Sequence, residues 1–596
     1  MKLLTDIWRL LDRRQRGGLL MMQALSLLMA LSTLAGIAAV APFFAVLGDP
    51  AAITRSPTLS WLYRHCGCHD QRGFVVALGL AFLGVVLLSN AVNLLGSLAM
   101  NRFAHRVGNR FCIALFDEYL HRGQQFHMAA NSSTLFNNVV WEVTRGSTGV
   151  LQSFLTLSTN AVTSILIIVS IVVVNPLIAL GTVIALGGSY GLIYLLARSR
   201  LQRNGLLESE LTEQRTRIVT ESLGAIKEIL LLRAQRFFSV KFAHSLQSIS
   251  RTAINTHAIA QGPRNILECI VVAGLVAVAL LLIDDGGRGG LWLAQLSFLG
   301  FAAFRLLPAL QQIFQSAVKI RGDRVAFERI AADLRSACSD TARSQSDRSE
   351  PRSRSGPTRP RDIQLRAVGF RYMGDRPFAI RDATARIPAG ATVGLLGASG
   401  SGKTTLAELL VGLLVPTSGT VEVDDVVLDE AGRAAWQTQI AYVPQHVFLF
   451  DASLAENIAL ATAPAEIDSE RVAAAARLAQ LDQFARTLPA GYGEKVGERG
   501  VRLSGGQRQR VGIARALYRP ASVLVLDEAT NALDGLTENE IMTTLQGLRG
   551  QYTIVLIAHR VSTPHAFDLV FELDNGTVTE RRTGPLRQST GLRSYV

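Results

Sequence analysis

Charged residues and cysteines are both scarce in this sequence of 596 residues. Asp, Glu, Lys and Arg make up 18% of it and hydrophobic residues 49%, whereas soluble globular domains carry about 25% charge. This balance excludes a disordered chain and argues against a fully soluble enzyme. Five cysteines in a chain of this length form no disulfide framework. Acidic residues are the minority charge, 47 against 60 basic ones, and such an excess taken alone suggests nucleic acid or an anionic membrane.

The hydrophobic residues gather in long runs. A transmembrane helix needs about 20 consecutive apolar residues to cross the hydrocarbon core of a bilayer. Six runs approach or exceed that length: Gly18–Leu47, Gly73–Met100, Val150–Val174, Pro176–Ala197, Asn265–Ile283 and Leu291–Ile313. The first half of the chain is therefore predicted to be a six-helix α transmembrane domain.

Basic residues cluster in alternate connections between these runs. The N-terminal flank and the second and fourth connections are rich in arginine, whereas the first, third and fifth are poor in it. Because positive flanks stay on the cytoplasmic side, we expect both termini and the two long connections to be cytoplasmic. Positive residues on the cytoplasmic side then explain the net charge of +13, and we expect no nucleic-acid partner.

Polar residues recur at helical spacing within three of the runs. The rows are Asn90, Asn93, Ser97 and Asn101 in the second run, Ser153, Thr156, Asn160 and Thr163 in the third, and Arg305, Gln312, Gln315 and Lys319 in and after the sixth. Small polar residues often join helices, and that explanation stays open for the Asn and Ser positions. A guanidinium deep in a span needs water, a counter-ion or an anionic ligand. We predict that Arg305 faces a cavity and, with Arg102, binds an anionic substrate; the alternative is a structural ion pair with Glu268.

The composition changes twice beyond the sixth run. The segment 336–360 is rich in Ser, Arg and Pro, which is typical of a flexible linker. After it, short apolar strands alternate with helical stretches, the pattern of an α/β domain with a parallel sheet. We predict a transmembrane domain over 1–335 with long cytoplasmic extensions, a flexible linker over 336–360 and a nucleotide-binding domain over 361–596.

A phosphate-binding loop follows the predicted strand Thr392–Leu396. From Gly397 to Thr405 the sequence reads GASGSGKTT, which matches the P-loop pattern. Its glycines let backbone N–H groups curl around phosphate at a helix N-terminus. We expect Lys403 to reach the β- and γ-phosphates and the Thr404 hydroxyl to coordinate Mg²⁺. ATP and Mg²⁺ are thus the predicted cofactors.

Two further motifs lie downstream of this loop. An apolar strand ends in Asp527 and Glu528; we expect Asp527 to complete the Mg²⁺ shell and Glu528 to polarise an attacking water. Just upstream, Leu503-Ser-Gly-Gly-Gln507 can bind phosphate through amides at a helix N-terminus. A Ser-Gly-Gly triplet alone carries little information, but its place between a phosphate loop and an Asp-Glu strand is specific.

In this order and spacing the motifs resemble those of ATP-binding cassette (ABC) transporters. The resemblance implies that Tyr372 stacks on adenine, that Gln445 senses Mg²⁺, that Asp534 belongs to the D-loop and that His559 contacts the γ-phosphate. Glu528, His559 and Gln445 are then the predicted catalytic residues. The predicted nucleotide-binding residues are Tyr372, Gly397, Ser399, Gly400, Gly402, Lys403, Thr404, Thr405, Ser504, Gly505, Gly506, Gln507 and Asp534, and the predicted metal ligands are Thr404, Gln445 and Asp527.

One membrane domain followed by one nucleotide domain resembles a half-size type IV exporter. Members of that group work as dimers with each ATP between the phosphate loop of one subunit and the Ser504 segment of the other, so we expect a homodimer. The resemblance also implies a multi-pass protein of the bacterial inner membrane. We expect the helical segments near Asn131–Asn138 and Thr220–Leu231 to dock on the nucleotide domain near Gln445.

A narrower resemblance concerns the substrate. The cytoplasmic segments Asn131–Asn137 and Glu221–Ile229 are similar to those of lipid-linked oligosaccharide flippases of the PglK type. This implies an ATPase that exports or flips an amphipathic anionic substrate, namely a lipid-linked oligosaccharide. Membrane lipids are the other expected partners. The alternative is an exporter of hydrophobic drugs, lipids or peptides. Six spans argue against a soluble ATPase acting on ribosomes or DNA, and intact hydrolytic residues argue against an ATP-gated channel.

Overall fold

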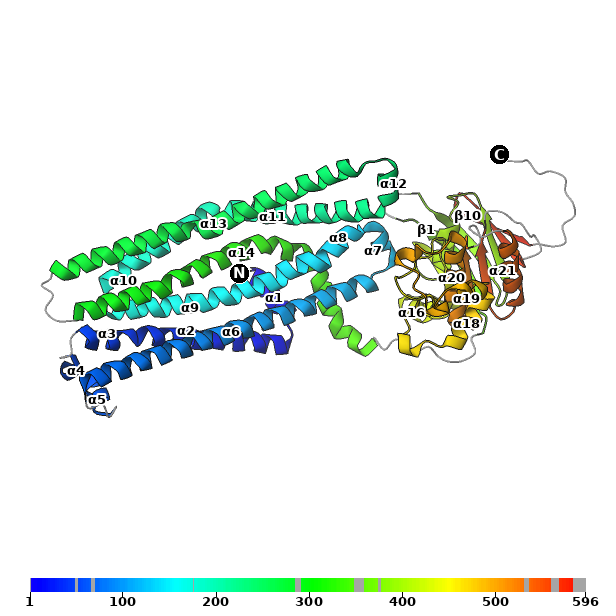
Figure 1. Cartoon of the computed structure of the whole chain (residues 1–596). Helices are drawn as coiled ribbons and strands as arrows, with labels where there is room; N and C mark the ends of the chain where they lie inside the picture. Colours follow the sequence, from blue (N-terminus) through cyan, green and yellow to red (C-terminus); the bar gives the residue numbers. More distant parts are fainter. Residues whose placement is uncertain are drawn as a thin grey trace. The chain divides into compact units, whose positions relative to one another are not determined.

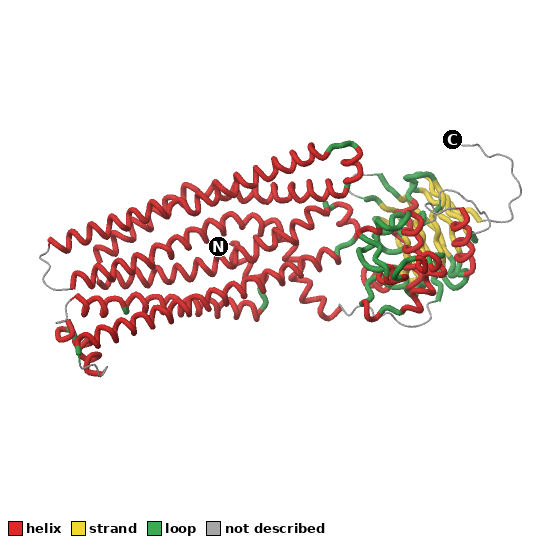
Figure 2. Tube along the Cα trace, viewed as in Figure 1, coloured by secondary structure: helices red, strands yellow, loops and turns green. Residues whose placement is uncertain are grey.

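The computed structural model of the chain describes residues 2–48, 52–65, 70–174, 176–284, 291–347, 359–372, 377–529, 535–558 and 567–582. The chain divides into two compact units (Figures 1 and 2). Met1–Arg122 and Ala130–Asp347 form the membrane unit, whereas Gly123–Ala129 and Arg348–Val596 form the ATPase unit. Helices build the membrane unit, and helices and strands alternate in the ATPase unit (Figure 2).

Helices of 4 to 57 residues make up the membrane unit. They are α1 (Lys2–Leu10), α2 (Arg13–Ala38), α3 (Val40–Gly48), α4 (Ala52–Arg55), α5 (Pro57–His65), α6 (Gln71–His121), α8 (Ser132–Asn137), α9 (Val150–Val174), α10 (Pro176–Thr182), α11 (Gly188–Gly224), α12 (Ile226–Leu231), α13 (Gln235–Asp284) and α14 (Leu291–Asp347). Short π-helical segments, 138–142, 144–149 and 183–187, join some of them. The described residues contain six helices long and apolar enough to cross a membrane, which confirms the six predicted spans.

Two properties of these helices suit a bilayer. Helix α6 has 51 residues, and at 1.5 Å per residue it extends about 77 Å, far beyond the roughly 30 Å of a hydrocarbon core. Its second half therefore continues outside the membrane, as the polar row after Met100 predicts. Along its apolar half, large side chains face outward rather than into the unit, among them Leu80, Leu87, Leu88, Leu94 and Leu95. Such exposed apolar surface is stable against lipid and costly in water.

The predicted linker begins later than expected. Helix α14 continues to Asp347, so residues 336–347 are helical and the prediction of an irregular segment from Ser336 is wrong for this part. The buried apolar face of the helix, which includes Ile330 and Leu334, reaches Ala337 and so carries α14 past Ser336 into the predicted linker. Burial of that face stabilises the helix where composition alone suggests flexibility.

The ATPase unit contains two sheets. In the larger sheet the strand order is β10 (Thr577–Arg582), β9 (Leu569–Asp574), β3 (Thr392–Gly397), β8 (Thr553–Ile557), β7 (Val523–Asp527) and β6 (Ile440–Val443). Its strands from β9 to β6 run parallel, as predicted, and β10 is antiparallel. The smaller sheet, which was not predicted, is antiparallel with the order β2 (Ile380–Ile387), β1 (Ile363–Phe370), β4 (Ser418–Val423) and β5 (Val426–Val427).

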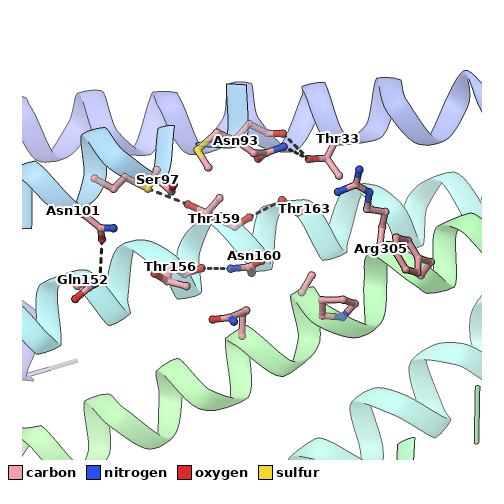
Figure 3. A pocket seen from close by; sticks show the side chains of 16 residues that line it. Thr33, Asn93, Ser97, Asn101, Gln152, Thr156, Thr159, Asn160, Thr163 and Arg305 are labelled. Carbon is pink, nitrogen blue, oxygen red and sulfur yellow. Dashed lines mark hydrogen bonds between the residues drawn. The ribbon is translucent and has the colours of Figure 1, made fainter. Parts of the chain in front are cut away.

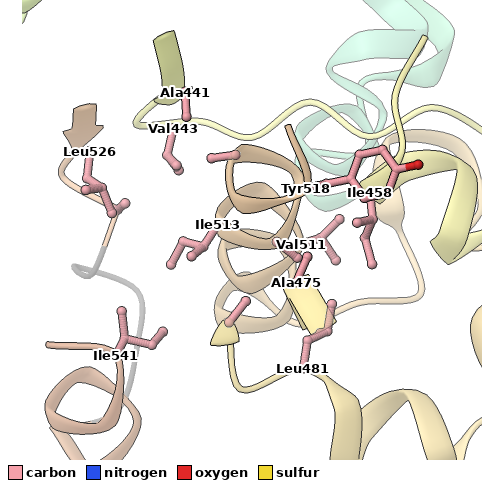
Figure 4. Close-up of a cluster of buried hydrophobic side chains, with 14 of the residues drawn as sticks. Ala441, Val443, Ile458, Ala475, Leu481, Val511, Ile513, Tyr518, Leu526 and Ile541 are labelled. Carbon is pink, nitrogen blue, oxygen red and sulfur yellow. The ribbon is translucent and has the colours of Figure 1, made fainter. Parts of the chain in front are cut away.

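Parallel strands place their carboxyl ends at one edge of the sheet, and the motifs follow strands β3, β6 and β7 there. The helices around the sheets are α15 (Lys403–Leu410), α16 (Glu430–Gln437), α17 (Leu454–Ile458), α18 (Ser469–Leu478), α19 (Asp482–Thr487), α20 (Gly505–Tyr518) and α21 (Gly535–Gly547). Apolar side chains of α20 and its neighbours form one buried cluster, in which Val511, Ile513 and Ile541 are at most 1% exposed (Figure 4). This core fixes the helix that carries the Ser504 segment at its start.

Candidate nucleotide site and membrane cavity

The phosphate loop connects β3 to α15. Three of its glycines have positive φ: Gly397 at 152°, Gly400 at 80° and Gly402 at 106°. At Gly402 a Cβ would lie 2.7 Å from the carbonyl oxygen of Ala379, so a side chain does not fit. Only glycine combines this backbone freedom with such close packing, which explains the spacing of glycines in the motif.

Lys403 begins α15 and folds back over the loop. Its ammonium Nζ donates to the carbonyl oxygens of Gly397 at 2.9 Å and Ala398 at 2.8 Å. Burial lowers the pKa of Lys403, and the negative charges of Glu528 and Asp527 oppose that shift. A positive charge held over a loop of backbone amides suits a polyphosphate.

Asp527 ends strand β7 in a buried position, 1% exposed. Its Oδ1 accepts from the Thr404 hydroxyl at 3.5 Å, and its Oδ2 accepts from the Tyr442 hydroxyl at 3.4 Å. Burial is the largest cause that raises the pKa of Asp527, and the nearby Glu528 raises it further. A cation bound to the Asp527 carboxylate would lower its pKa instead.

The residues at this site suit a Mg²⁺ ion that phosphate and water also bind. They do not suit a metal centre built from protein ligands alone. Among the described residues, no group of three His, Cys, Asp or Glu side chains could hold a metal ion. The carboxylate of Asp527 and the hydroxyl of Thr404 are the hard oxygen donors that Mg²⁺ prefers, with phosphate and water oxygens completing its shell. The sequence pattern missed Tyr442, which lies on the neighbouring strand β6 and contacts Asp527 only because β6 and β7 pair.

Glu528 and Gln445 meet although 83 positions separate them. The Gln445 Nε2 donates to the Glu528 Oε2 at 2.7 Å. Glu528 has a φ of 48°, the left-handed region that side chains other than glycine rarely adopt. Such backbone conformations cost about 1–3 kcal/mol and concentrate at functional sites. Two of the three predicted catalytic residues are therefore adjacent, with Glu528 in a backbone conformation that local propensity does not favour.

The other predicted nucleotide contacts lie around these elements. The Tyr372 hydroxyl bonds to Thr405 Oγ1 at 2.7 Å, which ties the predicted adenine-stacking ring to α15. Ser399 lies in the exposed part of the phosphate loop. Ser504 caps α20: its Oγ accepts from the backbone of Gln507 at 3.2 Å, and the Gln507 side chain accepts from the backbone of Ser504 at 2.8 Å. Gly505 and Gly506 form the first residues of that helix; Asp534 and His559 lie outside the described residues.

A short segment of the second connection belongs to the ATPase unit. Helix α7 (Gln124–Ala129) is part of that unit, and its Gln124 Nε2 donates to Glu408 Oε1 at 2.7 Å. The predicted docking segment Asn131–Asn138 belongs instead to the membrane unit, where Ser133 bonds to Thr220 on α11 at 3.1 Å. Docking of Asn131–Asn138 and Thr220–Leu231 on the nucleotide domain near Gln445 stays a prediction.

Within the membrane unit, the predicted polar rows meet at one cavity of about 550 Å³ (Figure 3). Its described lining residues are Met29, Thr33, Asn93, Ser97, Met100, Asn101, Gln152, Thr156, Thr159, Asn160, Thr163, Phe304, Arg305, Pro308, Ala309 and Gln312. Three hydrogen bonds cross between helices at this cavity: from Gln152 to Asn101 at 3.0 Å, from Asn93 to Thr33 at 3.0 Å, and from the Thr159 hydroxyl to Met100 Sδ at 3.6 Å. The predicted polar rows thus connect neighbouring helices and also form a polar wall of the cavity. Ser153, which belongs to one of these rows, is buried and is absent from the described lining.

Arg305 extends from α14 at this wall (Figure 3). Its guanidinium donates to Asn90 Oδ1 at 3.3 Å and lies 5.9 Å from the ring centre of Phe301. None of the described lining residues is acidic. Glu268, the alternative counter-ion, pairs with Arg264 at 2.6 Å. Arg102 is exposed and absent from the described lining, so the structure does not bring it together with Arg305.

Comparison with known proteins gives a consistent result for both units. Residues 17–301 match the family model "ABC transporter transmembrane region", and residues 380–531 match "ABC transporter". The chain is 30% identical to an ATP-dependent lipid A-core flippase of Burkholderia pseudomallei, over 78% of this chain and 77% of that protein. It is 29% identical to the flippase of the same name from Bordetella avium, over 93% of this chain and 90% of that one. A bacterial Atm1-family ABC exporter structure with ATP bound shares the fold, with a TM-score of 0.71, 23% identity and coverage of 95% and 94% of the two chains.

Proposed function

Because this chain belongs to the ABC transporter family, as a half-size exporter whose ATPase domain drives transport, we propose that it flips an amphipathic anionic glycolipid across the bacterial inner membrane. The substrate class we propose is a lipid-linked oligosaccharide. Both termini are cytoplasmic in this proposal, since the arginine-rich connections lie on that side. The curated relatives named above are lipid A-core flippases, which supports a lipid that carries charge and sugar.

Arg305 is the observation that carries the substrate proposal. A guanidinium within a membrane span is costly unless a partner compensates it. Its described contacts are an amide oxygen and an aromatic ring, both uncharged. A phosphate head group compensates a guanidinium well, because the planar fork of Arg matches two phosphate oxygens. The surrounding hydroxyl and amide groups from four helices supply further donors to such a head group.

The ATPase half of the proposal rests on the adjacency of Lys403, Asp527, Glu528 and Gln445. Lys403 holds the phosphates, Thr404 and Asp527 hold Mg²⁺, and Gln445 orients Glu528 toward the attacking water. Mg²⁺ when bound neutralises charge on the transferred phosphate. We propose that two copies of the chain bind ATP between the phosphate loop of one and the Ser504 segment of the other.

The substrate proposal is tested by reconstitution into proteoliposomes. We expect Arg305→Ala to abolish translocation of a polyprenyl-diphosphate oligosaccharide and its stimulation of the ATPase, while basal ATPase persists. Arg305→Lys should restore translocation only in part, because it keeps the charge and loses the fork. Arg102→Ala is the matched control, since its guanidinium is absent from the described lining of the cavity. Normal translocation by Arg305→Ala would overturn the anion site and favour an exporter of hydrophobic drugs, lipids or peptides.

A further inference from the structure

A second cavity of the membrane unit lies between α13 and α14 and measures about 650 Å³. Its described lining residues are Gln261, Arg264, Glu268, Val271, Val272, Leu275, Gly300, Ala303, Phe304, Leu307, Pro308, Gln311, Gln312 and Gln315. Four of them are glutamines, and two form an ion pair. For a cavity that borders the fifth and sixth spans, this is an unusual density of hydrogen-bonding groups, because polar side chains there are costly and are retained mainly for function.

The ion pair in this cavity is open rather than buried. Arg264 Nε lies 2.6 Å from Glu268 Oε1, and the two side chains remain 52% and 44% exposed. The pair spans one helical turn of α13, so it does not tie that helix to a neighbour. Each partner retains unused hydrogen-bonding capacity: the guanidinium has five N–H donors, and the carboxylate has two acceptor oxygens. A ligand in the cavity can therefore bond to both groups without breaking their contact.

The amide groups add donors and acceptors on the opposite wall. Gln311 is buried and donates through Nε2 to Gln261 Oε1 at 3.0 Å, which links α14 to α13 and fixes two of the four amides. Gln312 and Gln315 lie on α14 as part of the same lining. Phe304 is 69% exposed and adds a flat apolar face.

This cavity adjoins the one that contains Arg305. Phe304, Pro308 and Gln312 line both cavities, so the two cavities border the same stretch of α14. A molecule bound through a phosphate at Arg305 therefore lies beside residues that also line the second cavity.

We infer that the cavity between α13 and α14 is a saccharide subsite, which binds the hydroxyl-rich part of a lipid whose phosphate is held at Arg305. This inference rests on the proposed function. Neighbouring sugar hydroxyls act as both donors and acceptors, and paired amides, a carboxylate and a guanidinium satisfy both roles. A second anionic group fits poorly because of the Glu268 carboxylate. A purely apolar ligand would leave the remaining donors and acceptors of the ion pair unused and shielded from water.

The test compares lipids that differ only in their sugars. The probes are a polyprenyl diphosphate with and without its oligosaccharide, and lipid A with and without its core sugars, each titrated into the full-length protein in nanodiscs. The double variant Arg264→Gln/Glu268→Gln removes both charges together and leaves no unpaired one. The control is Arg324→Gln/Glu328→Gln, an i,i+4 pair on α14 with a contact of 2.7 Å that lines neither cavity.

We expect the double variant to raise the half-saturating concentration of one sugar-bearing lipid about tenfold, equivalent to about 1.4 kcal/mol. Binding of the matching lipid that lacks the oligosaccharide or the core sugars should change less than about twofold, and the control variant should bind like the wild type. The lipid pair that shows the difference identifies the source of the sugar. An equal loss for both members of a lipid pair, or no loss for either, overturns the subsite while Arg305-dependent binding upholds the proposed function. Failure of the wild type to bind any of the four lipids overturns both.

Discussion

Replacing Glu528 with glutamine separates the charge of the predicted base from its shape. The side chain keeps its length, and its amide oxygen still accepts from Gln445, whose Nε2 lies 2.7 Å from Glu528 Oε2. Glutamine and glutamate are both unbranched at Cβ, so the substitution adds no steric demand to the backbone at φ 48°. The phosphate loop and Lys403 are unchanged, so nucleotide affinity should persist. What is lost is the negative charge that polarises water.

The expected loss in turnover follows from the role assigned to that charge. General base catalysis contributes about 10²–10⁴-fold, which corresponds to about 2.7–5.4 kcal/mol of activation free energy. Release of phosphate by purified Glu528→Gln in nanodiscs should fall by this factor, while equilibrium binding of labelled ATP with Mg²⁺ stays within about threefold. Lys403→Ala is the contrasting variant, because it removes the charge that folds over the loop and should weaken binding itself. Hydrolysis near the wild-type rate by Glu528→Gln would refute the assignment of Glu528 as the base.

Two further predictions concern the stability of the ATPase unit. Burial raises the pKa of Glu408 more than its bond to Gln124 lowers it. At pH values above this raised pKa, the ionised carboxylate therefore destabilises the folded state. This destabilisation disappears as the pH falls through the raised pKa and the carboxylate takes up a proton. Glu408→Gln should therefore unfold at a higher temperature than the wild type at pH 8, with a difference that shrinks toward pH 5; a variant less stable at every pH would contradict this assignment. Ile513→Ala, at a side chain 1% exposed in the α20 core, should cost about 2–5 kcal/mol by denaturant unfolding, whereas Val426→Ala, 68% exposed, should change stability by less than about 0.5 kcal/mol.

The sequence alone determined the features that depend on local pattern. A bilayer requires a fixed length of apolar helix, so the six spans follow from counting residues. The phosphate loop is equally local, because positive φ at Gly397, Gly400 and Gly402 is a property of glycine itself. Arg305 also stood out from sequence, since a charge within an apolar run is costly wherever the neighbouring helices lie.

Tertiary structure decided what depends on which segments meet. From the sequence, Glu268 was a possible partner for Arg305. In the structure Glu268 pairs with Arg264 instead, because the two residues are four positions apart on one helix and their side chains are neighbours. The antiparallel sheet and the contact of Tyr442 with Asp527 arise from strand pairing across long sequence separations. Residues 336–347 were expected to be irregular from their composition, yet α14 continues because its apolar face is buried. The helical period of a sequence shows which residues share a face of a helix. Which other helix that face packs against depends on the tertiary structure. For this reason only the fold revealed that polar rows of α6, α9 and α14 line one cavity.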